Sequence, residues 1–209
     1  MSEYADLLII GAGPAGMAAA LAAAPSGARI VLLDDNPLPG GQIWRDGPQA
    51  NLPNTARQMR EQLEACSNIY RHSGTRVIAS AGPKQLLVED ADRGWLIGYD
   101  KLILCTGARE LLLPFPGWTL PGVTGVGGLQ ALIKGGLPVQ DERIVISGSG
   151  PLLLASAATA KHNGARVLRI AEQASAVAVA GFAAQLPRCL LYTSPSPRDA
   201  TLSRMPSSA

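Results

Sequence analysis

Three glycines near the start of the chain, Gly11, Gly13 and Gly16, have the spacing Gly-x-Gly-x-x-Gly. This spacing is typical of a turn that binds the pyrophosphate of a dinucleotide. The first glycine permits a tight turn, the second lets the backbone approach the phosphates, and the third lets a helix pack closely on a strand. The free N–H groups at the start of that helix stabilise the negative charge of the phosphates. The pattern predicts a dinucleotide site that includes Gly11, Gly13, Pro14, Ala15 and Gly16.

The residues around this turn predict a strand, a helix and a second strand, in that order. Residues 7–10 are a short apolar run that suits a buried parallel strand. Pro14 suits the first helical turn, and the alanine-rich residues that follow continue the helix. Residues 28–33 predict the second strand, which leads into two acids. An acid at this distance accepts hydrogen bonds from ribose hydroxyls, so we expect Asp34 to bind the ribose, with Asp35 as the alternative.

A second glycine turn follows later in the chain. Gly148 and Gly150 come directly after an apolar run at 143–146, and an apolar helix and a second strand at 165–170 follow them. Glu172 then takes the position of the acid. We interpret Gly148, Gly150 and Glu172 as a candidate second nucleotide site.

This second turn departs from the pattern at its third glycine position, which holds Leu153. A branched side chain there would crowd either the contact between helix and strand or the dinucleotide itself. Two alternatives therefore stay open. The second unit binds NAD(P), or it is a structural Rossmann-like domain that serves packing alone.

Composition limits the class of protein and its location. The chain has 209 residues, of which 47% are hydrophobic, and a formal net charge of +2, so nothing indicates a nucleic-acid partner. Its three cysteines, Cys66, Cys105 and Cys189, lack the spacing of metal ligands and favour a reducing compartment. No apolar run approaches the ~20 residues that a membrane span needs. We expect a cytoplasmic protein without a metal site or transmembrane segment.

Two segments resemble the FAD-binding segments of thioredoxin-reductase-like flavoproteins. One is Gly-Gly-Gln-Ile at residues 40–43, just after the acids, and the other is the apolar run and small residues at 102–108. Small residues at the carboxyl end of a strand allow a cofactor to lie close to the backbone. The resemblance implies FAD as the cofactor and adds to its site Gly41, Gln42, Val77, Thr106, Gly107 and Ala108.

Three stretches, GGQIWR, the segment from Gly107 to Gln130, and GSGPLLLA, closely resemble the FAD-containing alpha subunits of opine oxidases and D-hydroxyproline dehydrogenases. Hydrogen cyanide synthase has a related subunit. The resemblance implies an α/β fold in which a Rossmann-like FAD-binding domain carries an inserted second Rossmann-like domain of the NAD type. Residues 1–118 would be the first part of the FAD-binding domain, and 119–188 the start of the inserted domain, both incomplete.

The same resemblance implies an FAD-dependent oxidoreductase acting on a small-molecule amine or amino acid that is opine-, hydroxyproline- or glycine-like. A hydride would pass to flavin N5, and electrons would leave through partner flavoprotein and iron–sulfur subunits of a hetero-oligomer. One alternative is an NAD(P)H-dependent flavin reductase of the pyridine nucleotide-disulfide oxidoreductase class. Glu172 favours it, whereas Leu153 and the lack of a Cys-x-x-Cys pair oppose it. The other alternative is a non-catalytic nucleotide-binding module.

The sequence names no catalytic residue. The two histidines are His72, expected in a polar connection, and His162, expected to cap the helix before Asn163 and Gly164. Trp44 and Arg45 could reach the flavin side of the site. For each of these residues we favour a structural role.

Residues 189–209 differ from the rest of the chain, because they are rich in Ser and Pro and lack apolar periodicity. On both sides of residues 200–202 they back-translate into a transposase-type short-read sequencing adapter with its index barcode. We therefore expect this tail to be a translated adapter rather than natural protein. On that hypothesis residues 1–209 alone are catalytically inactive and bind FAD poorly.

Overall fold

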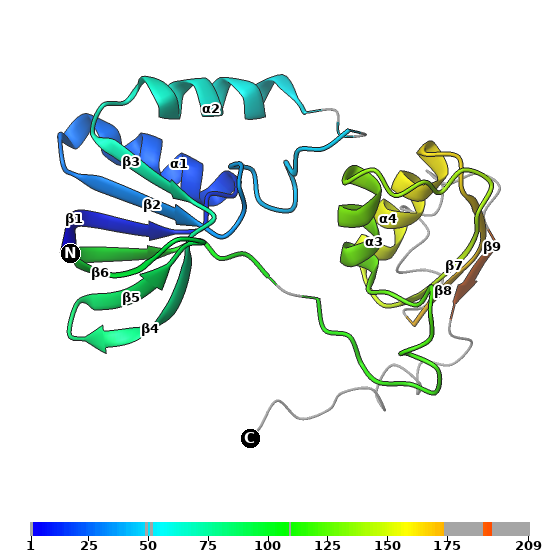
Figure 1. Cartoon of the computed structure of the whole chain (residues 1–209). Helices are drawn as coiled ribbons and strands as arrows, with labels where there is room; N and C mark the ends of the chain where they lie inside the picture. Colours follow the sequence, from blue (N-terminus) through cyan, green and yellow to red (C-terminus); the bar gives the residue numbers. More distant parts are fainter. Residues whose placement is uncertain (1, 49, 51, 109, 174–189, 194–209) are drawn as a thin grey trace. The chain divides into compact units, whose positions relative to one another are not determined.

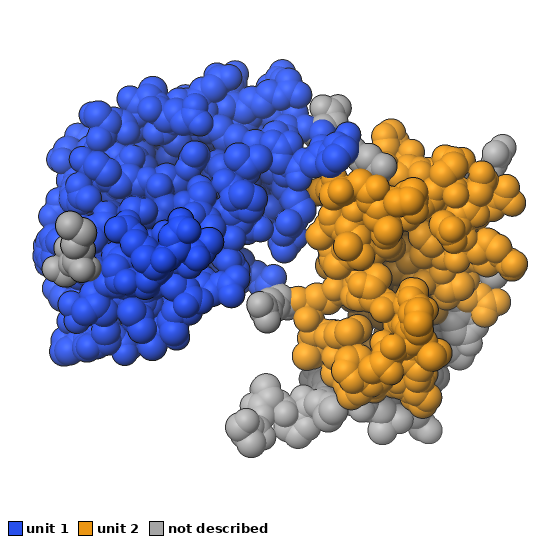
Figure 2. Space-filling view, in the orientation of Figure 1, with its two compact units in different colours: residues 1–109 blue, residues 110–209 orange. Residues whose placement is uncertain are grey.

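The computed structural model describes residues 2–48, 50, 52–108, 110–173 and 190–193 (Figure 1). The chain divides into two compact units, residues 1–109 and 110–209 (Figure 2). The sequence placed the first domain boundary after residue 118, nine residues later than the division between the units. Each unit contains one of the predicted strand–helix–strand motifs, which confirms the α/β fold class.

The first unit is built on a six-stranded sheet with the strand order β3-β2-β1-β6-β5-β4. Strands β3, β2, β1 and β6 are parallel, and β5 and β4 continue the sheet in antiparallel pairing. The sequence predicted only the apolar ends of β1 and β6, and the first halves of the two strands also pair with each other. The bounds are β1 Ser2–Ile10, β2 Ile30–Asp34, β3 Ile69–Ser73, β4 Arg76–Gly82, β5 Gln85–Glu89 and β6 Gly94–Leu104.

Helices α1 (Pro14–Ala23) and α2 (Asn54–Ala65) cover one face of this sheet (Figure 1). Every residue of β2 is buried, as expected for a parallel strand covered on both faces. Alternate side chains of β1 and β2 therefore enter two separate cores. The core on the helix side contains Ile9, Met17, Ala20, Ile30, Leu32 and Leu63. The core on the other face contains Leu8, Val31, Leu33, Leu86, Val88, Trp95 and Ile97.

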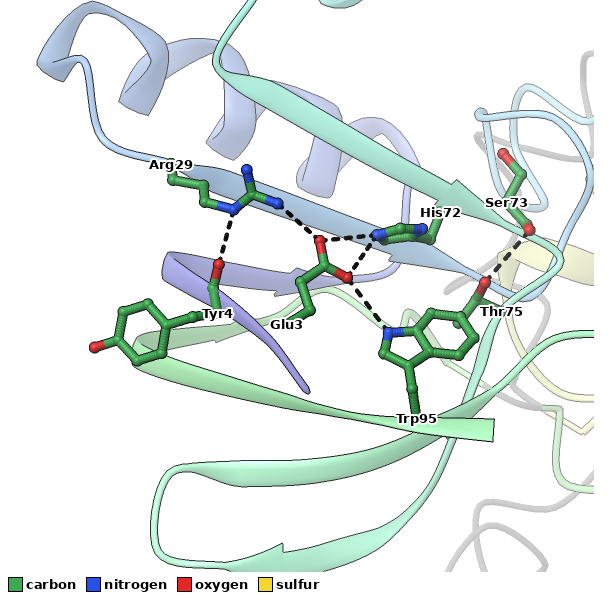
Figure 3. Close-up of polar contacts among 7 residues, drawn as sticks. All are labelled: Glu3, Tyr4, Arg29, His72, Ser73, Thr75 and Trp95. Carbon is green, nitrogen blue, oxygen red and sulfur yellow. Dashed lines mark hydrogen bonds and ion pairs between the residues drawn. The ribbon is translucent and has the colours of Figure 1, made fainter. Parts of the chain in front are cut away.

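A polar cluster joins the start of β1 to β3 and β6 (Figure 3). The Glu3 carboxylate lies 3.0 Å from Nε2 of His72, and it accepts hydrogen bonds from Nε1 of Trp95 (3.3 Å) and from the Arg29 guanidinium (3.0 Å). The His72 ring also meets the edge of Trp95, with 5.5 Å between ring centroids. The sequence-based expectation for His72 was wrong, because it lies in β3 and faces the other strands rather than a connection.

The partners of Glu3 determine its protonation state. Burial acts to raise the pKa of Glu3, but the hydrogen bond and charge of His72, together with the hydrogen bonds from Arg29 and Trp95, outweigh burial and lower the pKa below its usual value. The carboxylate is therefore charged at neutral pH. It fixes three strands that are far apart in sequence at one place in the unit.

The second unit contains a parallel sheet with the order β7-β8-β9 and two helices. The predicted strands at 143–146 and 165–170 are confirmed as β7 and β8, each extended to the acid or glycine that follows. His162 is the last residue of α4 and Asn163 is the cap, one position later than expected. The bounds are α3 Val126–Lys134, β7 Arg143–Gly148, α4 Pro151–His162, β8 Arg166–Glu172 and β9 Leu190–Thr193.

Four residues of the tail expected to be adapter sequence form β9, which pairs with β8. The rest of residues 189–209 lies outside the described part of the chain. Among the residues that the structure describes, no helix has the length and apolarity needed to cross a membrane.

Candidate dinucleotide-binding site

Two of the three glycines in the first turn are required by the chain's own packing. Gly11 adopts a φ of +101°, and a Cβ added to it would overlap the carbonyl oxygen of Cys105, just after β6. A Cβ added to Gly16 would overlap the carbonyl oxygen of Gly11. These glycines let α1 and the ends of β1 and β6 approach one another closely.

Gly13 differs from the other two glycines. Its backbone is extended, with φ −69° and ψ −178°, a conformation that any L-residue adopts. Among the described residues, an added Cβ would meet only the Cα of Gly41, at 3.9 Å. The chain itself therefore does not require glycine at this position. The open space beside Gly13, at the start of α1, fits the pyrophosphate of a bound dinucleotide.

The acid at the end of β2 is connected to this turn. Asp34 is 7% exposed, and its carboxylate accepts hydrogen bonds from the amide of Ala12 and from the backbone and side chain of Asn36, the last two at 2.7 Å. Asp35 is exposed and forms an ion pair of 3.0 Å with Arg76. The structure thus places Asp34, and not Asp35, against the glycine turn. A carboxylate has about four acceptor positions, so Asp34 retains capacity for a ribose hydroxyl.

Replacing Asp34 with asparagine tests this difference. Both carboxylate oxygens accept N–H groups, so either orientation of the new amide places one donor against another donor. We expect Asp34→Asn to lower the free energy of unfolding by about 1–3 kcal/mol and to weaken FAD binding. Asp35→Asn, which breaks only an exposed ion pair, should cost about 0–1 kcal/mol. Urea denaturation and FAD titration measure both, and equal effects would contradict the assignment.

The Gly-Gly-Gln segment lies directly against the glycine turn. The amide of Gly40 donates to the carbonyl oxygen of Ala12 at 2.7 Å. Gly41 has a φ of +58°, and a Cβ there would come within 3.1 Å of the Cα of Gly13. Gln42 accepts a hydrogen bond from Arg45 at 3.2 Å. Two segments that the sequence assigned separately to FAD therefore form one surface.

The second predicted FAD segment also starts at this turn. The amide of Cys105 donates to the carbonyl of Ile10 at 2.7 Å, and Thr106, Gly107 and Ala108 follow it as exposed residues. Gly107 has a φ of +72°, which favours glycine. In the described part of the chain, three predicted FAD segments, residues 11–16, 40–43 and 106–108, therefore meet at the carboxyl ends of β1 and β6.

Val77 lies near the acids at the end of β2, because the two residues before it contact them. The amide of Thr75 donates to the carbonyl of Asp34 at 2.9 Å, and Arg76 pairs with Asp35. Val77 follows in β4, partly buried against the core on the face opposite the helices. Its contact with FAD stays a prediction.

In the second glycine turn, as in the first, a buried acid accepts a hydrogen bond from a backbone amide of the turn. Glu172 is 4% exposed, and its carboxylate accepts a hydrogen bond of 3.0 Å from the amide of Gly150. Leu153 is buried in the core of the second unit, and its side chain comes within 3.3 Å of the position of a Cβ on Gly148. Leu153 therefore fills the contact between helix and strand. Gly148, Gly150 and Glu172 stay a candidate nucleotide site.

Two further side chains lie near the first site. The sequence pointed to Trp44 but not to Arg60. Trp44 packs against the core under α2. Arg60, on α2, donates a hydrogen bond to the Trp44 carbonyl and was missed. The apolar spacing of Ala56 and Leu63 marks the inner face of α2, and Arg60 lies on that face, so the pattern could have identified it. Within the described ranges, no group of His, Cys, Asp and Glu side chains could hold a metal ion.

Comparison with known proteins agrees with this geometry. A family model described as pyridine nucleotide-disulphide oxidoreductase matches residues 5–190. The chain is 37% identical over 176 residues to the HcnB subunit of hydrogen cyanide synthase from Pseudomonas aeruginosa, covering 79% of this chain and 38% of the relative. It is 38% identical over 170 residues to an opine oxidase subunit from Agrobacterium tumefaciens, covering 73% of this chain and 34% of the relative.

A similar solved structure is the Cu(II) complex of the HOCl-induced flavoprotein disulfide reductase RclA from Escherichia coli. It has a TM-score of 0.62 at 21% identity, and the match covers 92% of this chain and 49% of that one. This likeness concerns the fold. The chain spans less than half the length of the curated relatives it matches.

Proposed function

The chain belongs to the pyridine nucleotide-disulphide oxidoreductase family, and from this premise we propose that it binds FAD at the glycine turn and serves the dehydrogenation of an amine or amino acid. The family and the relatives are FAD-dependent oxidoreductases. The observation that carries the proposal is the difference among the three glycines. Packing explains Gly11 and Gly16, whereas Gly13 faces open space that suits a pyrophosphate.

The residues of the chain have separate tasks at this site. The amides at the start of α1 would bind the pyrophosphate and stabilise its charge. Asp34 holds the Ala12 amide and so keeps the turn in one conformation before the cofactor arrives. The segment that contains Gly41 forms the adjoining wall. Bound FAD would supply a hydride acceptor at flavin N5, while these residues bind and orient the dinucleotide.

The substrate and partners are part of the same proposal. The matched relatives are named as subunits of opine oxidase and of hydrogen cyanide synthase, which supports a small amine or amino-acid substrate and a hetero-oligomer. We propose that electrons leave through flavoprotein and iron–sulfur partner subunits. The chain's cysteines form no Cys-x-x-Cys pair, so we do not propose disulfide chemistry. The same cysteines support a reducing, cytoplasmic location.

Anaerobic flavin reduction tests the proposal. The protein expressed from its complete gene should purify with FAD, and the flavin absorbance should bleach on addition of octopine, D-hydroxyproline or glycine, depending on which is the substrate. NADH should bleach it far more slowly. A protein that contains no FAD would refute the cofactor assignment. Flavin that none of these compounds reduces would favour a non-catalytic nucleotide-binding module.

One observation favours a second candidate function. Glu172 holds the Gly150 amide as Asp34 holds that of Ala12, and Leu153 is turned into the core. These features support a second dinucleotide turn and hence an NAD(P)H-dependent flavin reductase. Fast bleaching by NADH or NADPH, without bleaching by amines, would establish this alternative and overturn the first proposal.

A further inference from the structure

A long irregular segment forms one wall of the candidate site. Residues 35–53 connect β2 to α2, and those of them that the structure describes lie in no helix or strand. Connections longer than about 12–15 residues are uncommon in compact domains and are usually functional. The segment contacts the glycine turn where the Gly40 amide bonds to the Ala12 carbonyl and where Gly41 lies against Gly13. Its shape therefore controls the space beside Gly13.

Arg60 of α2 connects two points of this segment. Its Nη1 donates to the carboxylate of Asp46 at 2.9 Å, and its Nη2 donates to the carbonyl oxygen of Trp44 at 3.1 Å. A Cβ on Gly40 would lie 3.0 Å from Nη2, so the guanidinium also packs on the glycine. The planar fork of arginine makes such paired bonds with little loss of freedom, which a lysine ammonium cannot do. Arg60 thus holds residues 40–44 at Trp44, while the bond to Ala12 holds them at Gly40.

The surroundings of Arg60 indicate a role beyond general stability. The side chain is only 16% exposed, and its Nε is buried without a hydrogen-bond partner in the described part of the chain. A buried charged group with an unpaired donor is costly, and an apolar side chain of similar length would fill the same space without that cost. The hydrogen bond from Arg60 is the foremost cause of the lowered pKa of Asp46. Asp46 is therefore a carboxylate at neutral pH.

We propose that Arg60 is a positioning residue that holds residues 40–44 in the shape that receives FAD. The inference rests on the proposed function, because it assigns the space beside Gly13 to FAD. Arg60 acts through the backbone of Trp44 and Gly40, which in turn sets the place of Gly41. Without the fork, the Gly40–Ala12 bond and the bond of 3.0 Å from the Trp44 amide to the Gly40 carbonyl remain, but the Trp44 carbonyl loses its bond to Arg60 and this end of the segment moves more.

The test compares Arg60→Met, which keeps length and packing but removes the donors, with Arg57→Met, an exposed position on the same helix. In the apo protein, hydrogen exchange at the amide of Trp44, which donates to the Gly40 carbonyl, should be at least ~10-fold faster in Arg60→Met, the change that ~1.4 kcal/mol produces. Exchange at the amides of β1 and β2 should not change. Arg57→Met should match the wild type at every amide.

FAD affinity and the visible circular dichroism of bound flavin supply the second measurement. We expect Arg60→Met to raise the Kd for FAD by roughly tenfold and to change the flavin spectrum. Arg60→Lys should recover little of either, since one ammonium does not reproduce the fork. Asp46→Asn, which leaves the bond to Trp44, should change the Kd by less than about threefold.

Three results would overturn the inference. Wild-type exchange at the Trp44 amide in Arg60→Met would show that the fork does not hold the segment. Faster exchange throughout the first unit would show general structural support instead of positioning. Faster local exchange with an unchanged Kd would show that the shape of residues 40–44 does not affect FAD binding. A wild-type protein that binds no FAD refutes the proposed function, while the exchange experiment still reports on the segment.

Discussion

Replacing Gly13 with alanine is expected to weaken FAD binding by about 10- to 100-fold, the effect of an overpacking cost of ~1–3 kcal/mol. The added methyl group enters the space assigned to the pyrophosphate, and Gly13→Val, with two more methyl groups, should abolish binding. The apo protein should not lose stability. Its backbone at Gly13 is extended and the nearest atom to the new Cβ, Cα of Gly41, lies 3.9 Å away. Alanine in place of glycine restricts the unfolded chain, which adds about 0.4–1 kcal/mol of stability and offsets the lower preference for alanine at this N-cap.

Isothermal titration measures the Kd for FAD, and urea denaturation measures the free energy of unfolding of the apo protein. A loss of FAD affinity without a loss of apo stability is a combination that no general folding defect produces. Full FAD affinity in Gly13→Ala would show that the pyrophosphate does not bind beside Gly13. A large loss of apo stability would instead mean that packing requires Gly13 as it requires Gly11.

The second large effect is expected at Gly16, where alanine should lower the free energy of unfolding by about 3 kcal/mol or more. The new methyl group overlaps the carbonyl oxygen of Gly11. That backbone cannot yield easily, since the Gly11 amide is bonded to the Leu33 carbonyl at 2.7 Å. FAD binding should be lost together with the fold, in contrast to Gly13→Ala. With total stabilities of about 5–15 kcal/mol, much of the first unit's stability would disappear.

Ala18→Gly is the matched control on the same helix. Ala18 is exposed, so this change lowers helix propensity by about 1 kcal/mol without creating an overlap. Thermal unfolding monitored by circular dichroism should place Gly16→Ala well below Ala18→Gly. If both variants melt at the same temperature, α1 has moved away from the turn and the close contact is not required.

Much of the first site was predictable because its geometry is local. The glycine spacing, the proline at the first helical position and the acid after the second strand all lie within one strand–helix–strand motif. The choice between Asp34 and Asp35 was left open, although strand alternation decides it. Ile30 and Leu32 face the helices, and Asp34 follows with the same parity.

Features that depend on distant residues could not be predicted. His72 has polar neighbours in sequence, but its partners Glu3 and Trp95 come from other strands. The start of β1 is polar and shows its strand character only through pairing with β6. The spacing of Ala56 and Leu63 puts Arg60 on the inner face of α2, but its bond to the carbonyl of Trp44 in another segment leaves no pattern in the sequence.

The cluster around Glu3 has a consequence for synthesis on the ribosome. Its partners Arg29, His72 and Trp95 follow Glu3 by 26, 69 and 92 residues. At about 5–20 residues per second, Trp95 is made roughly 5–20 s after Glu3. During that interval β1, whose final neighbours are β2 and β6, has an unpaired edge that can pair with other chains. That edge of β1 therefore stays available to other strands until β6 emerges, and slow translation between the two strands prolongs the exposure.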